Sequence, residues 1–247
     1  MTDHFGRRRA ASPVHVAVQG NGPVVMLLAG TGHDSSDWQR AGYVDGLAGQ
    51  FTVAAVDLPG QGQTAGTADP AAYALAELLG ILDRVADYLA APEFAVLGYS
   101  SGGSLALQAA ARDRRTRAAF VMAAVTGETL DPLTVASSTR QAMAVHEAKL
   151  AGTLDTLPLT PAQRDTAARL DIPAHVAWLH AEMSWPPVLP ADLRCPVLLY
   201  LGSADPLVPP PPAPGSLLEL RIQPDLDHEA VFETSGPAIS AALTFLT

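Results

Sequence analysis

Short apolar runs alternate with longer segments of mixed character along most of the chain. A continuous apolar run predicts a strand that is buried on both faces, whereas apolar residues spaced three or four apart predict a helix. Helical spacing of this kind runs from about residue 73 to residue 90. Strands are expected at residues 14–18, 24–29, 52–56, 94–97, 118–125, 197–201 and 217–222. Strands that alternate with helices predict an α/β fold with a mostly parallel, doubly wound sheet.

The first strands and the last helix of this pattern can be predicted in more detail. Apolar residues alternate at 14–18 and meet a turn-rich stretch at 19–22, which predicts a hairpin with the strand at 24–29. After the strand at 217–222, one helix is expected from about residue 229 to residue 246.

The alternation stops between residues 126 and 190, where no buried strand is expected. Helix-compatible stretches at 133–153, 161–170 and 174–183 are separated by prolines, which end helices. We therefore predict that residues 126–190 form a helical lid inserted before the last two strands. Residues 1–125 and 191–247 are then expected to form the core.

Composition narrows the classes of function. With 247 residues, 48% of them hydrophobic, the chain is long enough for one sizeable domain. Its formal net charge of −10 disfavours a nucleic-acid partner. No apolar stretch reaches the roughly 18 residues of a membrane helix, so no membrane partner is expected. The arginines at 7–9 are not followed by the apolar segment of an export signal.

Cysteine and histidine usage gives further expectations. Cys195 is the only cysteine, so the chain has no internal disulfide, and a cytoplasmic location is expected. It precedes a proline and an apolar strand, a position more typical of a buried residue than of a nucleophile. The histidines lack the spacing of a zinc site, and we expect neither a metal nor a cofactor. The expected partner is a small-molecule substrate, and the pattern indicates no oligomeric state.

The stretch Gly98-Tyr99-Ser100-Ser101-Gly102 stands between the strand at 94–97 and an alanine- and leucine-rich helix at 103–111. A Gly-x-Ser-x-Gly pattern in this context is typical of the nucleophile elbow of a serine hydrolase. The small flanking residues let the strand and the helix approach, and the serine stands at the positive end of the helix dipole. Alternatively, the stretch is a glycine-rich turn in which Ser100 caps the helix.

Two later strands end in residues that would complete a catalytic triad. Asp205 follows the strand at 197–201, and His228 follows the strand at 217–222. In such a triad His228 takes the proton of Ser100, and Asp205 holds the imidazole in the correct tautomer. Taken singly, Asp205 is equally well a turn residue and His228 a helix-start residue. All three lie at carboxyl ends of strands, where parallel sheets place their chemistry, and this favours the triad.

Two glycine-rich loops extend the pattern. The chain resembles the α/β-hydrolase superfamily from about residue 14 to residue 246, outside the predicted lid. The resemblance rests on the elbow, on Asp205 and His228, and on the motifs Leu28-Ala29-Gly30-Thr31 and Asp57-Leu58-Pro59-Gly60-Gln61-Gly62-Gln63-Thr64. It implies an oxyanion hole formed by the backbone N–H groups of Thr31 and Ser101.

The resemblance also implies alternatives and departures. In some members the acid follows the preceding strand, where Glu128 is the nearest carboxylate; Asp205 is preferred because Val125 and Thr126 occupy that strand end. Members commonly place a helix after the acid, whereas the prolines between 206 and 214 predict a short extended connection. Serine rather than aspartate in the elbow disfavours the epoxide-hydrolase and haloalkane-dehalogenase variants.

These residues predict a cofactor-independent serine hydrolase. It would cleave a carboxylester, lactone or thioester bond of a small to medium, largely apolar substrate through an acyl-enzyme. Two alternatives stay open: a cofactor-free haloperoxidase-like perhydrolase with the same triad, and a lidded pocket that binds or folds a ligand without hydrolysis. The candidate substrate contacts are His33, Trp178, Met183 and Trp185. An exposed loop position for His33, and packing of the lid on the core for the tryptophans, are the structural alternatives.

Overall fold

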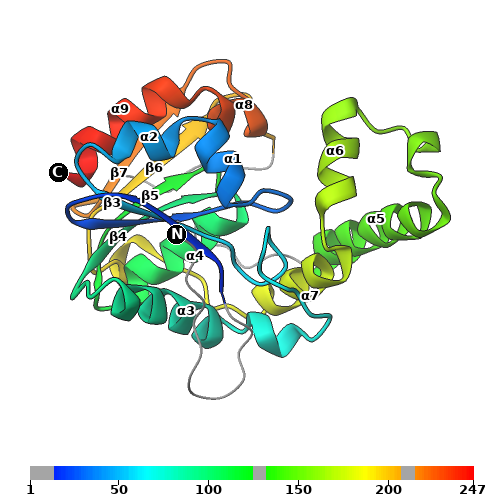
Figure 1. Ribbon diagram of the computed structural model, residues 1–247, viewed down its shortest axis with the longest axis horizontal. Helices are drawn as coiled ribbons and strands as arrows, with labels where there is room; N and C mark the ends of the chain where they lie inside the picture. The colour runs from blue at the N-terminus through cyan, green and yellow to red at the C-terminus, as the bar shows by residue number, and fades with distance from the viewer. Residues whose placement is uncertain (1–13, 125–131, 207–214) are drawn as a thin grey trace.

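The computed structural model describes residues 14–124, 132–206 and 215–247 (Figure 1). Within them, one seven-stranded sheet has the order β1-β3-β2-β4-β5-β6-β7. The strands are β1 (Val16–Gly20), β2 (Val24–Leu28), β3 (Thr52–Val56), β4 (Phe94–Tyr99), β5 (Thr116–Met122), β6 (Val197–Gly202) and β7 (Leu218–Gln223). All neighbouring pairs are parallel except β1 and β3. The predicted α/β fold with a mostly parallel sheet is confirmed.

The predicted hairpin between the first two strands is wrong. β1 pairs antiparallel with β3, with Val16 opposite Val56 and Gly20 opposite Thr52. All five residues of β2 are buried, and both of its hydrogen-bonding edges are taken, by β3 on one side and β4 on the other. β1 is mostly exposed, so it fits the edge of the sheet and not its centre.

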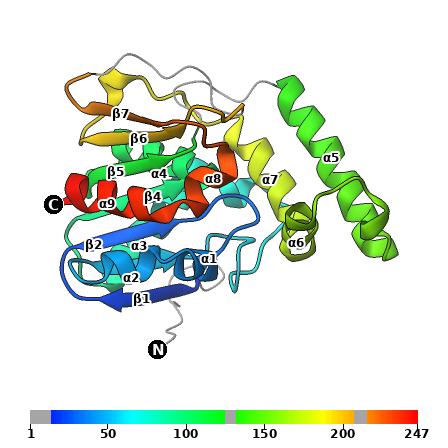
Figure 2. The ribbon, with the colours of Figure 1, turned by 90° about the horizontal axis from the view of Figure 1, so that it is seen from above.

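Helices cover both faces of the sheet (Figures 1 and 2). On β2, Met26 and Leu28 face α3 (Leu75–Tyr88) and α4 (Ser101–Arg112), whereas Val25 and Leu27 face the opposite side. That side holds α1 (Ser35–Arg40), α2 (Tyr43–Leu47), α8 (His228–Glu233) and α9 (Ser235–Leu246). Successive strand side chains point to opposite faces, so one sheet serves two hydrophobic cores.

The last helical segment is divided in two, in contrast to the single helix that its apolar pattern predicts. α8 ends where Thr234 N donates to the Ala230 carbonyl (2.9 Å), and α9 starts at Ser235. A continuous helix would place Pro237 in its interior, where proline has no N–H to donate. The break puts Pro237 in the first turn of α9, where that N–H is not needed.

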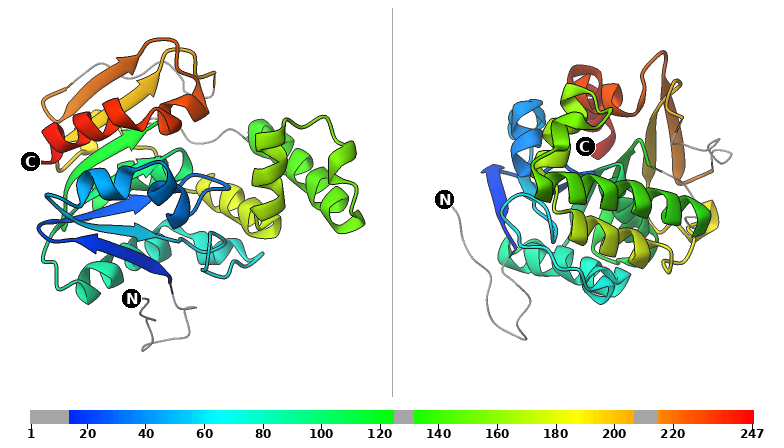
Figure 3. Two further views of the ribbon diagram at one scale, coloured as in Figure 1. Left: turned by 45° about the horizontal axis from the view of Figure 1, so that its top comes forward. Right: turned by 90° about the vertical axis from the view of Figure 1, so that its right-hand side faces the viewer.

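The region between β5 and β6 is helical, as predicted. It contains α5 (Pro132–Ala151), α6 (Pro161–Arg169) and α7 (Ile172–Glu182), with short 3₁₀ turns at Leu154–Thr156 and Pro190–Asp192. A further 3₁₀ turn, Pro70–Tyr73, precedes α3. α7 lies next to the body of the protein, while α5 and α6 stand off from the sheet (Figure 3). We call residues 132–190 the insertion.

Three predictions fall on segments outside the described residues: the arginines at 7–9, Glu128 as the alternative acid, and an extended connection after Pro206. Cys195 is buried as predicted, and its Sγ contacts the Ala110 carbonyl (3.8 Å). Across the described residues, no helix combines the length and the apolar character needed to cross a membrane.

Candidate active site

Ser100 occupies a sharp turn between β4 and α4. Its φ of 53° and ψ of −119° lie in a region that residues with a side chain rarely adopt. A Cβ at Gly98 would collide with the backbone of Gly102, so the strand and the helix can come this close only with glycine. The Ser100 side chain makes no capping hydrogen bond to α4, in contrast to the alternative prediction of a helix cap. The turn therefore presents the hydroxyl outward.

The structure brings Ser100, His228 and Asp205 together in one hydrogen-bonded chain. Ser100 Oγ lies 2.9 Å from His228 Nε2, and His228 Nδ1 lies 2.7 Å from Asp205 Oδ2. The Asp205 side chain has no exposed surface, while that of His228 is 23% exposed. An ionised carboxylate only accepts, so Nδ1 carries the proton and Nε2 is free to accept the proton of the serine.

Local structure explains how each partner is held. Asp205 follows the end of β6. His228 is the first residue of α8, behind Asp227, whose side chain caps the helix by accepting from Ala230 N (2.9 Å). The Tyr99 hydroxyl donates to the His228 carbonyl (3.2 Å), so the elbow strand also supports the histidine. Burial and nearby carboxylates, Glu229 foremost, raise the pKa of Tyr99, which keeps this donor protonated.

The Thr31 loop passes beside the elbow. A Cβ placed on Gly30 would lie 2.9 Å from Ser100 Cβ, so the peptide that joins Gly30 to Thr31 borders the nucleophile. Ser101 N belongs to the first turn of α4, where backbone N–H groups have no partner within the helix. The hydroxyls of Thr31 and Ser101 lie 3.3 Å apart. This arrangement can offer two backbone donors to a negatively charged oxygen next to Ser100.

His33 does not take the position predicted for it. It is only 7% exposed, so its interpretation as an exposed loop residue is wrong. Its Nε2 lies 3.1 Å from Glu229 Oε1, and its ring packs edge-on against Tyr99 and Phe232. Burial lowers the pKa of His33, but the hydrogen bond and charge of Glu229, the charge of Asp37 and the Thr31 carbonyl together raise it above its ordinary value. His33 ties the Thr31 loop to the start of α8.

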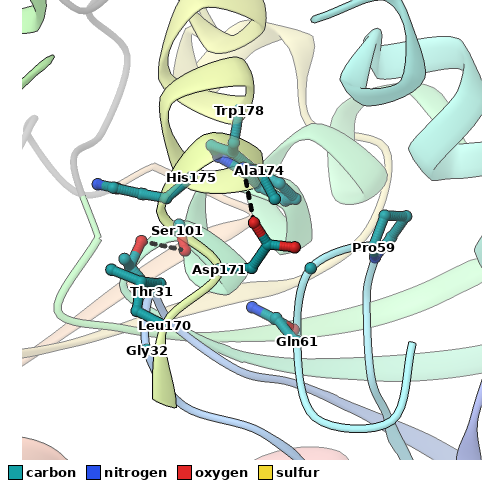
Figure 4. A pocket seen from close by; sticks show the side chains of 11 residues that line it. Thr31, Gly32, Pro59, Gln61, Ser101, Leu170, Asp171, Ala174, His175 and Trp178 are labelled. Atoms are coloured by element: carbon teal, nitrogen blue, oxygen red, sulfur yellow. Dashed lines mark hydrogen bonds between the residues drawn. The ribbon is translucent and has the colours of Figure 1, made fainter. Parts of the chain in front are cut away.

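A cavity of about 20 Å³ lies between the Thr31 loop and α7. It has room for about one water molecule. Its walls are formed by Thr31, Gly32, Pro59, Gly60, Gln61, Ser101, Leu170, Asp171, Ala174, His175 and Trp178 (Figure 4). Of the four predicted substrate contacts, only Trp178 is in this set. Trp185 is buried with its Nε1 donating to the Tyr73 carbonyl (3.3 Å), and Met183 ends α7.

The cavity includes residues that the sequence prediction missed. Ala174, His175 and Trp178 lie three, four and seven residues after the N-cap residue Asp171, which places all four on one face of α7. Counting this spacing back from Trp178, a predicted substrate contact, would have identified the other three residues. Burial lowers the pKa of His175 to about 4, so this side chain is uncharged at neutral pH.

Metal binding has no support within the part of the chain that the structure describes. No three of its histidine, cysteine, aspartate and glutamate side chains are grouped to hold an ion.

Comparison with known proteins agrees with this geometry. Residues 25–242 match the family described as "Alpha/beta hydrolase family". The chain belongs to this family. A hydrolase from Pseudomonas aeruginosa PA01 superimposes with a TM-score of 0.77 at 18% identity, covering 99% of this chain and 98% of the other. The enol-lactonase from Burkholderia xenovorans LB400 gives 0.74 at 20% identity, covering 95% and 96%. At these identities the two superpositions show a shared fold alone.

Curated relatives match over shorter segments. The pimeloyl-[acyl-carrier protein] methyl ester esterase of Nitrosomonas europaea is 33% identical over 97 residues, which are 39% of this alpha/beta hydrolase and 35% of the esterase. Across the curated relatives, the matched part spans between 23% and 35% of each relative's length.

Proposed function

We propose that this alpha/beta hydrolase cleaves ester bonds with Ser100 as the nucleophile. The observation that carries the proposal is the hydrogen-bonded chain from Ser100 Oγ through His228 to Asp205, built on an elbow that requires glycine at positions 98 and 102. A hydroxyl is a weak nucleophile unless a base takes its proton in the attack, and the His228 Nε2 is placed to do so.

The steps follow from this geometry. Ser100 Oγ attacks the carbonyl carbon while its proton passes to His228, and the carbonyl oxygen becomes an oxyanion facing the N–H groups of Thr31 and Ser101. Collapse of this intermediate breaks the C–O bond, and His228 returns the proton to the leaving alcohol. Water then attacks the acyl-serine, again losing a proton to His228, and the carboxylic acid is released with Ser100 restored.

The walls of the cavity favour an uncharged, largely apolar substrate. Pro59, Leu170, Ala174 and Trp178 supply apolar surface, and His175 is neutral. Asp171 supplies the charged group in this set, and its carboxylate repels anionic substrates. By their names, two proteins similar to this one act on a methyl ester and on an enol-lactone. We therefore place carboxylesters and lactones first, with thioesters as chemically related substrates.

The insertion acts as a lid in this proposal. The cavity between the Thr31 loop and α7 holds about one water, so α6 and α7 would shift if a substrate occupied it. Arg169, the last residue of α6, attaches this helix to the start of α1. Its Nη1 lies 3.1 Å from Asp37 Oδ2 and 3.8 Å from Asp34 Oδ2. These ion pairs join the two parts that such a shift would separate.

A covalent probe tests the nucleophile. A fluorophosphonate should label the wild-type protein at Ser100, as mapped by mass spectrometry, and the Ser100→Ala variant should not react. Ser101→Ala is the matched control, because it removes the neighbouring hydroxyl and keeps the backbone N–H. A panel of p-nitrophenyl esters, lactones and acyl thioesters then ranks the substrate classes. Full turnover by Ser100→Ala would overturn the acyl-enzyme mechanism and favour a pocket that acts without hydrolysis.

A further inference from the structure

The turn after β3 sends one side chain to the Thr31 loop. The amide of Gln61 is held at both ends: Oε1 accepts from Leu58 N (3.2 Å), and Nε2 donates to the carbonyls of Ala29 (3.1 Å) and Gly30 (3.3 Å). Because Oε1 is committed to a backbone N–H, the NH₂ group must face the loop. The orientation of this amide is therefore determined by its own contacts.

The carbonyl that Gln61 holds and the Thr31 N–H belong to the same peptide unit. A trans peptide is planar, so its C=O and N–H point in opposite directions. The Gly30 carbonyl also accepts from His33 N (3.1 Å). Two donors on one side thus keep the Thr31 N–H on the other, and no acceptor within the described residues takes that N–H.

This peptide borders the nucleophile, as the close approach of Gly30 to Ser100 Cβ shows. If the peptide rotated, it would offer a carbonyl oxygen to the developing oxyanion in place of an N–H. Two like partial charges would then face each other where the reaction needs attraction. The orientation of one peptide consequently has a direct effect on the transition state.

The turn that carries Gln61 has a separate anchor. Asp57, 1% exposed, accepts from Ser35 N (2.7 Å) through Oδ1 and from Gln63 N (2.9 Å) through Oδ2. These bonds join the turn to the segment that follows the Thr31 loop without using the Gln61 side chain. A change confined to the Gln61 amide is therefore expected to leave the turn folded.

We propose that Gln61 is a positioning residue that holds the Gly30–Thr31 peptide so that the Thr31 N–H faces the oxyanion. The inference rests on the proposed function, since this orientation matters to the reaction only if Ser100 attacks a carbonyl. Gln61 also lines the cavity, so its effect has to be separated from simple substrate contact (Figure 4).

The test is Gln61→Glu, which keeps the shape of the side chain and sets a carboxylate oxygen against two carbonyl oxygens. With p-nitrophenyl butyrate, kcat should fall about 10- to 100-fold while KM stays within about twofold. Gln63→Glu, in the same turn, is the matched control. The Gln63 amide is exposed and contacts His15 Nε2 (3.1 Å). The kcat of this variant should stay within about twofold of wild type. A rise in KM at unchanged kcat would show substrate contact and overturn the inference.

The pH profile adds a readout that a general structural defect would not change. As the pH falls, the introduced carboxyl takes up a proton, and its O–H can donate to one of the two carbonyls again. The ratio of kcat for Gln61→Glu to kcat for wild type should then rise about threefold or more between about pH 8 and about pH 5. A flat ratio would contradict the positioning role.

Active-site titration separates this inference from the proposed function. Fluorophosphonate labelling counts competent Ser100 sites, and kcat is expressed per labelled site. Wild-type protein that neither labels nor turns over esters would overturn the proposed function and this inference with it. Wild-type protein that labels and turns over, with Gln61→Glu equally fast per site, would overturn the role of Gln61 alone. Should Gln61→Glu fail to fold, Gln61→Met carries the test, with an expected fall of about 5- to 10-fold from loss of the donor.

Discussion

The part of the site built by the sheet and the part built by the insertion differ in how firmly they are held. Asp205, His228 and Ser100 follow strands of one sheet, and each is fixed by backbone geometry and at least one short hydrogen bond. The insertion contacts the Thr31 loop through Thr166, which packs on Gly32, and α1 (Ser35–Arg40) through the exposed guanidinium of Arg169. Its outer helix, α5, packs on α6 and α7 and leaves Leu150 76% exposed.

This contrast separates chemistry from access. Groups that transfer protons need fixed distances, and strand ends supply them because a buried sheet opens only on global unfolding. A segment with few buried contacts opens locally at low cost. Within the insertion this applies to α5 and α6, whereas α7 belongs to the larger hydrophobic core. We therefore expect substitutions on the sheet side to change the rate of the chemical step, and substitutions in the insertion to change opening.

The largest effect is expected from His228→Ala. Without the base, kcat should fall about 10⁶-fold, because the Ser100 hydroxyl keeps its proton. His180→Ala, at an exposed position of α7, removes a histidine from the insertion and should leave kcat within about twofold of wild type. Steady-state hydrolysis of p-nitrophenyl esters measures both. Comparable losses in the two variants would remove the distinction between the two parts.

Asp205→Asn should lower kcat about 10⁴-fold, because an amide can donate to His228 Nδ1 and so favour the wrong tautomer. The control is Asp227→Asn, at the N-cap of α8 directly before His228. Asparagine caps a helix about as well as aspartate does, so α8 should be retained. Circular dichroism should show both variants folded. Equal activity of Asp205→Asn and wild type would exclude Asp205 as the acid of the triad.

Arg169→Ala tests the attachment of the insertion. Loss of a partly exposed ion pair should speed hydrogen exchange in residues 161–182 by about 3- to 5-fold and leave the strands unchanged. Wild-type protein in about 0.5 M salt should approach the variant, since salt screens the pair. Arg164→Ala is the control, because its guanidinium contacts Leu157 within the insertion. The same exchange rates in both variants would argue against a specific attachment through Arg169.

The smallest effect concerns pH and His175. Its pKa is about 4 in the folded protein and 6.5 when unfolded, so the unfolded chain binds the additional proton between these values. Stability should therefore decrease as the pH falls from about 6.5 to about 4. His175→Gln should lessen the drop in Tm over this range by about 2–4 °C. His180→Gln, on the exposed side of the same helix, should keep the wild-type slope.

Prediction from sequence succeeded where a local pattern specifies a local structure. The elbow needs only a strand, a tight turn and a helix in succession, and Asp205 and His228 each follow an apolar strand. Helix and strand types are therefore readable almost throughout. The structure brings these three side chains together because parallel strands end at one edge of the sheet.

Prediction failed where the partner lies far away in the chain. The pairing of β1 with β3 depends on which edge of the sheet is free, and the contact of His33 with Glu229 joins residues 196 positions apart. The residues of α7 that line the cavity carry no motif. Their role depends on how the insertion is placed over the sheet, which its helical pattern does not encode.

The buried thiol has a practical consequence for measuring motion. Burial raises the pKa of Cys195 to about 11, so this single native cysteine offers almost no thiolate to a maleimide dye at neutral pH. A second cysteine introduced by Leu150→Cys would then be the one reactive site, on the outermost helix of the molecule. Fluorescence from a dye at that point would report whether the surroundings of α5 change during turnover, without a signal from Cys195.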